Sequence, residues 1–249
     1  MQLKKLEKKY SVHVYDTGPD GRASLCALFN FMQDIASEHA DILGFGRSDL
    51  LKSNHFWILS RMYAEISELP CWGDTVKVLT WPNGTEKLFA MRNYEILLPD
   101  GRSSTAASSS WLIVDRTTKK INRPDNFLAG FSEAVQAGIR NPGKLPEPVL
   151  EGEVASELRV RISDLDMNHH TNNVSYLRWI NDSYDPDFVT NHFPCSAEIN
   201  YLSESVYNDN IVVRSLKAEG DDSIYSHSVF RTDDNKELCR IRLGWRKRS

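Results

Sequence analysis

The sequence predicts an α+β protein made of two tandem copies of one unit. The segment 16–34 aligns with the segment 164–182 without a gap, and weaker matches further along each copy follow in the same order. Each copy also reads as one strand, one helix and then four strands, which is an α+β ordering. A length of 249 residues accommodates two such copies.

The first copy opens with an alternating strand at Tyr10, Val12 and Val14. A helix with apolar residues at helical spacing follows, with Ser24 as its N-cap and its end near Gly44. Four further strands are predicted at 56–66, 75–81, 89–98 and 104–114, with a hairpin turn at 99–101.

The second copy repeats this order. Its first strand is predicted at Leu158, Val160 and Ile162, and Asn172 or Asn173 caps a shorter helix. The later strands are predicted at 197–202, 211–218, 223–231 and 237–245, with a hairpin turn at 233–235. A helix wrapped by a curved antiparallel sheet is a hotdog, so the whole chain is predicted to be a double hotdog.

The predicted domains are an N-terminal hotdog at 1–122, a linker at 123–157 and a C-terminal hotdog at 158–249. The linker is inferred from its prolines and glycines, and it includes a short helix predicted at 131–139.

Composition excludes several classes of protein. The chain is 41% hydrophobic and 26% charged, with a formal net charge of −4, which rules out disorder and disfavours a globally basic nucleic-acid binder. No run approaches the roughly 18 apolar residues of a membrane span. The four cysteines are scattered, and the charged N-terminus does not resemble a secretory signal. We therefore expect a cytoplasmic protein.

The densest polar cluster runs from Asp164 to Asn173, between a strand and a helix N-terminus. Backbone N–H groups and the helix dipole favour negative charge at that place. The first copy carries an ordinary turn at 16–24 instead. This asymmetry predicts one active site per chain, in the second copy.

The cluster also allows other interpretations. Asp164, Asp166 and Asn168 copy the opening of a calcium loop, but His169 and Ser175 stand where that loop needs Gly and Glu. Adjacent histidines rarely bind one metal ion. A plain polar turn that caps the helix is the simplest alternative. We predict no metal and no cofactor.

The stretch 164–176, with Trp179 and Ile180 after it, resembles the signature of the acyl-acyl-carrier-protein (acyl-ACP) thioesterases of plant plastids and bacteria. The segments 57–61 and 72–76 and the pair Trp111–Leu112 fit the same family. The resemblance implies a double hotdog that hydrolyses fatty acyl thioesters of acyl carrier protein, releases free fatty acid and ends chain elongation.

The resemblance also implies the site residues. The family's acid, amide and histidine fall on Asp166, Asn168 and His170, and its further catalytic glutamate falls on Glu204, on the next strand. Plant members often carry Cys after that glutamate, and this chain has Ser205, which argues against a Cys–His–Asn mechanism.

We expect Glu204 to act as general base on water and His170 to orient that water or protonate the leaving thiol. Asn168 would hold the carbonyl oxygen or the water, and Asp166 would fix Asn168 and His170. Direct attack by Asp166 through an anhydride remains open.

The first copy is expected to shape the acyl pocket with Phe29, Phe31, Met32 and Ile35, or these side chains simply fill its core. Alternative functions are an acyl-CoA thioesterase, a hotdog hydratase or dehydratase of acyl thioesters, and a catalytically silent acyl-binding protein. The expected partner is acyl carrier protein, with no nucleic acid and no membrane, and a homodimer is allowed for.

Overall fold

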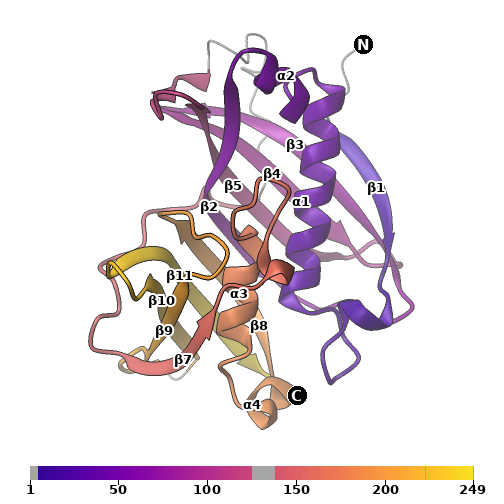
Figure 1. The fold of residues 1–249 in the computed structure, drawn as a ribbon. Coiled ribbons are helices and arrows are strands. Elements are labelled where there is room, and N and C mark those ends of the chain that lie inside the picture. The colour runs from indigo at the N-terminus through magenta and orange to yellow at the C-terminus, as the bar shows by residue number, and fades with distance from the viewer. Residues whose placement is uncertain (1–4, 125–137, 222, 249) are drawn as a thin grey trace. The chain divides into compact units, whose positions relative to one another are not determined.

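A computed structural model describes residues 5–124, 138–221 and 223–248. The chain divides into two compact units, Met1–Pro142 and Gly143–Ser249. We call them the N-terminal and the C-terminal unit. Each combines one principal helix with an antiparallel sheet (Figure 1).

The N-terminal unit pairs its strands in the order β1-β3-β4-β5-β2, all antiparallel, and the short β6 pairs with β5. Its elements are β1 (Leu6–Ser11), η1 (Val14–Asp16), α1 (Leu25–Ile42), α2 (Arg47–Lys52), β2 (His55–Ile66), β3 (Thr75–Glu86), β4 (Phe89–Leu97), β5 (Ser103–Asp115) and β6 (Ile121–Asn122).

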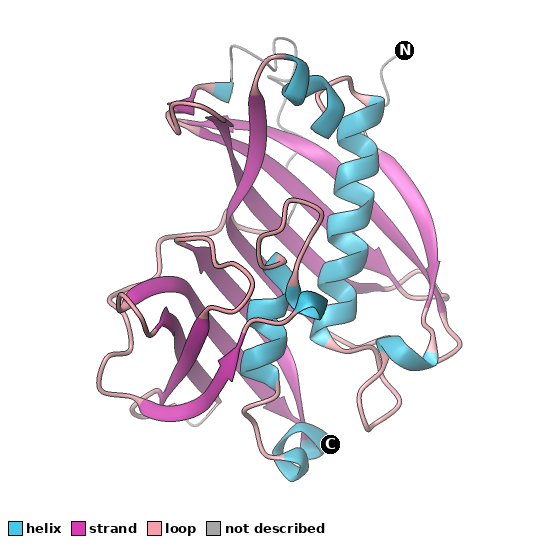
Figure 2. Ribbon diagram, in the orientation of Figure 1, coloured by secondary structure: helices cyan, strands magenta, loops and turns pink. Residues whose placement is uncertain are grey.

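Helix α1 forms where the sequence predicts it. The Ser24 hydroxyl caps its first turn by accepting from Ala27 N, and Gly44 follows its end at φ 79°, a left-handed backbone that suits glycine. The expected lining residues Phe29, Met32 and Ile35 are buried in the core of this unit. Figure 2 shows α1 lying along one face of the curved sheet. An acyl pocket in this unit stays a prediction.

The C-terminal unit pairs its strands in the order β8-β11-β10-β9-β7, again antiparallel throughout. Its elements are β7 (Glu153–Arg159), η3 (Ile162–Asp164), α3 (Asn173–Asn181), α4 (Pro186–Asn191), β8 (His192–Tyr201), β9 (Asn210–Lys217), β10 (Ile224–Arg231) and β11 (Lys236–Lys247). Asn172, one of the two predicted caps, begins α3 by accepting from Val174 N at 2.9 Å.

The first strand of each unit ends earlier than the alternation predicts. β1 ends at Ser11 and β7 ends at Arg159, and a 3-10 turn follows each of them. Val14 and Ile162, predicted to continue the buried face, are 68% and 76% exposed in these turns. Two or three alternating residues are too short a pattern to locate a strand end.

Three other boundaries differ from the prediction. β8 begins at His192 and β3 extends to Glu86, both longer than expected, while β7 begins at Glu153, inside the segment assigned to the linker. The short helices α2 and α4 were not predicted. The helix predicted at 131–139 falls mainly on residues 125–137, outside the described residues.

The architecture confirms the α+β double hotdog, since each unit sets a helix against an antiparallel sheet (Figure 2). In the ranges that the structure describes, no helix is long and apolar enough to cross a membrane.

Candidate functional site

Both units build the same turn between their 3-10 turn and their principal helix. In the C-terminal unit, Asp166 N donates to His170 O at 2.8 Å. In the N-terminal unit, Gly18 N donates to Arg22 O at 2.9 Å. These are the positions that the gapless alignment of the two copies equates, so the repeat extends to individual backbone hydrogen bonds.

Each turn is fastened to the connection that leads toward the next long strand. Thr171 N donates to Ser205 O at 2.9 Å, and the equivalent Ala23 N donates to Pro70 O at 2.7 Å. The two units therefore share one main-chain scaffold around the candidate site. What differs between them is the set of side chains placed on that scaffold.

The side chains differ at the two positions that matter most for chemistry. The C-terminal unit carries His170 and Glu204, whereas the N-terminal unit carries Arg22 and Leu69 at the equivalent places. Arg22 Nη1 donates to Leu69 O at 3.2 Å. At these equivalent positions, the acid–imidazole pair is present in the C-terminal unit and absent from the N-terminal unit, as the asymmetry between the two turns predicts.

His170 and Glu204 form the centre of the site. His170 Nε2 lies 3.4 Å from Glu204 Oε2, and the two side chains are 37% and 49% exposed. A carboxylate within contact distance of an imidazole can act as a proton-transfer pair. Their exposure leaves both groups accessible to water and to a ligand.

Asp166 is held by its own turn. Its Oδ1 accepts from Asn168 N at 2.7 Å and from His170 N at 3.2 Å. Its Oδ2 accepts from Asn168 Nδ2 at 3.3 Å. These three hydrogen bonds fix the carboxylate within the turn and orient the Asn168 amide. The three predicted residues of the turn therefore do lie together.

Glu204 lies in a different place from the one predicted. The family resemblance predicts that Glu204 lies on the next strand, but β8 ends at Tyr201 and Glu204 lies in the connection to β9. Arg231 Nη1 holds this connection by donating to Glu204 O at 3.4 Å and to Asp209 Oδ2 at 3.2 Å.

Ser205 is buried beside the site and bonded to two other hydroxyls. Its Oγ lies 2.6 Å from Thr171 Oγ1 and 3.0 Å from the Tyr176 hydroxyl. Its side chain has no exposed surface. Ser205 therefore links the connection that carries Glu204 to the turn that carries His170.

A buried carboxylate that received no role from the sequence anchors the turn to α3. Asp164 is 4% exposed and pairs with the Arg178 guanidinium, while Trp179 Nε1 donates to it at 3.2 Å. Arg161 N donates to its other oxygen at 2.7 Å. The only sign of this contact in the sequence is the position of Arg178 and Trp179, which follow Asp164 by 14 and 15 residues on the predicted helix.

This anchoring argues against the calcium interpretation, because the oxygens of Asp164 are taken by protein donors rather than free for a cation. Among the described residues, no cluster of three or more His, Cys, Asp or Glu side chains is arranged to hold a metal ion.

Two family models match the chain. The acyl-ACP thioesterase N-terminal domain matches residues 3–131, and the acyl-ACP thioesterase C-terminal domain matches residues 149–247.

Curated relatives match along nearly the whole chain. An acyl-[acyl-carrier-protein] hydrolase, chloroplastic, of Cuphea viscosissima is 29% identical over 97% of this chain and 63% of the relative's length. An oleoyl-acyl carrier protein thioesterase, chloroplastic, of Arabidopsis thaliana is 25% identical over 98% of this chain and 77% of its own length. The chain thus spans less than two thirds of the first of these relatives.

Solved structures share the fold. An acyl-ACP thioesterase from Bacteroides thetaiotaomicron superposes with a TM-score of 0.89 at 22% identity, covering 98% of both chains. A 12:0-ACP thioesterase from Umbellularia californica gives a TM-score of 0.83 at 22% identity, covering 100% of this chain and 99% of the other. With both family models matched in order along its length, the chain belongs to the acyl-ACP thioesterase family.

Proposed function

We propose that the chain hydrolyses fatty acyl thioesters of acyl carrier protein, releasing free fatty acid and ending elongation. The single observation that carries the proposal is the His170–Glu204 pair beside the Asp166–Asn168 turn, on a scaffold whose other copy lacks the pair. Membership of the family and the names of its curated relatives support the same activity.

Hydrolysis needs a nucleophile made from water and a proton for the leaving thiol. In the proposed mechanism Glu204 accepts a proton from water as the water oxygen bonds to the carbonyl carbon. The C–S bond then breaks, and His170 supplies the proton that the departing sulfur takes up. The 3.4 Å approach of Nε2 and Oε2 lets the proton return from Glu204 to His170.

Asn168 and Asp166 act in support of this pair. The Asn168 amide, held by Asp166, is assigned to the carbonyl oxygen or the attacking water. The N-terminal end of α3, which begins at Asn173, favours the negative charge that develops on the oxygen.

The Asp166 carboxylate is better suited to position its neighbours than to attack the thioester carbonyl as a nucleophile. Its carboxylate takes three hydrogen bonds from its own turn, which lowers its nucleophilicity. We therefore favour general-base catalysis by Glu204 over an anhydride formed on Asp166.

A thiol-release assay with matched acyl-ACP and acyl-CoA substrates of several chain lengths tests the proposal. We expect release of carrier thiol, with a higher kcat/KM for acyl-ACP. A preference for acyl-CoA would replace the carrier assignment and keep thioester hydrolysis. Binding of acyl-ACP without thiol release would support a silent acyl-binding protein, and hydration of an enoyl thioester would support a hotdog lyase; either result would overturn the proposal.

Location and assembly are part of this proposal. A cytoplasmic location stays a prediction, and the curated relatives named above are chloroplastic. A homodimer also stays a prediction, and sedimentation of the purified chain measures it directly.

A further inference from the structure

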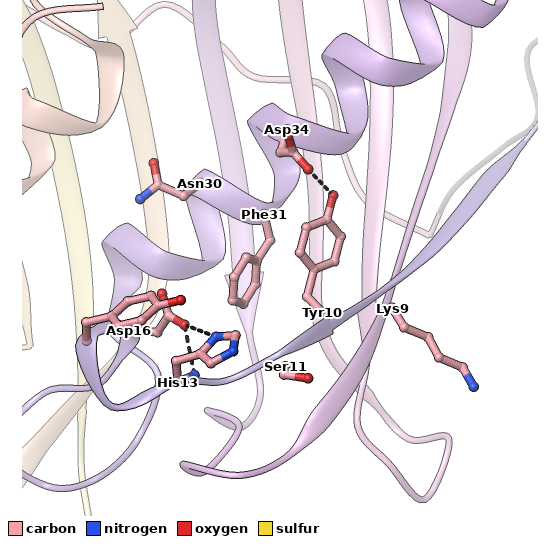
Figure 3. A pocket seen from close by; sticks show the side chains of 9 residues that line it. Lys9, Tyr10, Ser11, His13, Asp16, Asn30, Phe31 and Asp34 are labelled. Atoms are coloured by element: carbon pink, nitrogen blue, oxygen red, sulfur yellow. Dashed lines mark hydrogen bonds and ion pairs between the residues drawn. The ribbon is translucent and has the colours of Figure 1, made fainter.

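A surface pocket of about 410 Å³ lies in the N-terminal unit, between β1, η1 and the first turns of α1 (Figure 3). The His170–Glu204 pair belongs to the other unit. The side chains that the argument below uses are Tyr10, His13, Tyr15, Asp16, Asn30 and Phe31.

The second copy of the repeat shows what occupies the equivalent place there. Asp16 corresponds to Asp164, and Asn30 corresponds to Arg178 in the gapless alignment, which also equates the N-caps of α1 and α3. In the C-terminal unit, the guanidinium of Arg178 fills the space beside Asp164 and pairs with its Oδ1.

The N-terminal unit lacks both side-chain donors that reach the Asp164 carboxylate in the C-terminal unit. Asn30 is exposed where the second copy has Arg178, and Phe31, which has no N–H, replaces Trp179. The pocket therefore lies where the second copy places an arginine side chain.

The Asp16 carboxylate retains one oxygen for a ligand. Its Oδ2 accepts from His13 N at 2.9 Å and lies 3.3 Å from His13 Nδ1. No donor within the described part of the chain reaches its Oδ1, and the side chain keeps 14% of its surface open to solvent. A charged donor brought by a ligand can therefore reach this oxygen, and hydrogen bonds between charged groups are stronger than those between neutral ones.

Aromatic pairs flank this carboxylate. Tyr10 and Phe31 stack with ring centroids 4.9 Å apart, and His13 and Tyr15 stack at 5.0 Å with an interplanar angle of 10°. Flat ring faces beside a carboxylate match a guanidinium, which is planar, donates several hydrogen bonds in one plane and stacks on aromatic rings.

Neighbouring lysines do not take the place of such a cation. Lys8 Nζ is bound to Asp34 at 3.0 Å and to Glu38 at 2.7 Å. Figure 3 shows the Lys9 side chain extending away from the other labelled residues. Asp34 accepts from the Tyr10 hydroxyl at 2.7 Å, which leaves Asp16 as the carboxylate for the ligand.

We propose that this pocket binds an alkylguanidinium group in the position that Arg178 occupies in the second copy. The group comes either from a small guanidine compound or from an arginine side chain of a partner. This inference stands apart from the thioesterase proposal, since it uses none of the residues assigned to hydrolysis.

Calorimetric titration of the full chain with agmatine, with a capped Gly-Arg-Gly peptide and with cadaverine tests the proposal. We expect the guanidinium probes to bind and cadaverine to bind about tenfold more weakly. Tighter binding of agmatine identifies a small compound as the source, and tighter binding of the peptide identifies a partner's arginine. Absence of binding by both guanidinium probes up to about 10 mM, or equal binding of cadaverine, would overturn the proposal.

Two variants locate the binding. Asp16→Asn should weaken agmatine binding about tenfold or more, whereas Asp49→Asn, which removes a partly exposed carboxylate from α2, should leave it unchanged. Because Asp16 also supports η1, a second variant is needed. Asn30→Arg should fill the pocket from within, raise the Tm and block agmatine. Binding of agmatine to Asn30→Arg as to the unaltered chain would contradict the assignment.

Discussion

His170 and Glu204 come from separate segments of the C-terminal unit, yet Nε2 of the one lies 3.4 Å from Oε2 of the other. The main chain brings them together, because Thr171 N donates to Ser205 O immediately beside the pair. The N-terminal unit makes the equivalent backbone contact but carries other side chains. The backbone geometry is therefore common to both units, and the chemistry depends on the side chains at these positions.

The first prediction concerns the role of Asp166. In a single turnover in ¹⁸O-water, we expect the label in the released fatty acid and none in the Asp166 carboxylate, because its three hydrogen bonds fix the carboxylate within its own turn and lower its nucleophilicity. Mass spectrometry of the peptide 160–178 checks this. Label in Asp166 would establish the anhydride route instead.

The second prediction concerns the anchor of the turn. Arg178→Met should lower the free energy of unfolding by about 1–3 kcal/mol, since it leaves the Asp164 carboxylate buried without its cation. Arg102→Met is the matched control, because Arg102 pairs with exposed Glu68 and such pairs contribute about 0–1 kcal/mol. Urea unfolding measures both, and an equal cost for the two variants would refute the anchor.

The third prediction separates structure from catalysis at Ser205. Ser205→Ala should retain turnover within about tenfold and lower stability by about 1–2 kcal/mol, because Thr171 and Tyr176 lose a buried hydroxyl partner. Thiol release and urea unfolding on the same variant test this. A loss of turnover beyond a hundredfold at unchanged stability would instead identify Ser205 as a nucleophile.

The fourth prediction concerns acid stability. His227 is buried, with Ser215 Oγ 2.7 Å from Nδ1 and the Tyr184 hydroxyl 2.8 Å from Nε2, and burial lowers its pKa to about 3. Between its ordinary pKa of about 6.5 and that value, the unfolded chain binds the proton and the folded chain does not. Stability should therefore fall with falling pH, by up to about 1.4 kcal/mol per pH unit from this group.

Urea unfolding at several pH values between 7 and about 4 checks this dependence. His227→Gln should flatten it, and His55→Gln in β2 is the control for loss of an imidazole elsewhere. An unchanged slope in His227→Gln would show that another group sets the acid sensitivity.

Local signals in the sequence predicted the parts of the fold that depend on local chemistry. The caps Ser24 and Asn172 are examples, since each hydroxyl or amide bonds a backbone N–H two or three residues away. The start of β8 could not be predicted in this way. Pro194 argues against a strand interior, but it sits opposite a register shift beside Gly244, where an irregular pairing tolerates it.

Some residues of the candidate site could likewise be predicted from local sequence, and others could not. Asp166, Asn168 and His170 share one turn, so their proximity follows from sequence spacing. Glu204 could be placed only through the family resemblance, because strand β8 and the connection after it intervene before it reaches His170. The Asp164–Arg178 pair was missed because a helix must form before those two side chains meet.

The central claim is that His170 and Glu204 act together in thioester hydrolysis. Its most direct test is kcat/KM on acyl-ACP for Glu204→Gln, His170→Ala and the double variant, with Glu157→Gln on β7 as the control and circular dichroism to verify folding. We predict a loss of about a hundredfold or more in each single variant, no further loss in the double variant, and unchanged turnover in the control. Near-normal turnover in a folded Glu204→Gln or His170→Ala protein would contradict the account.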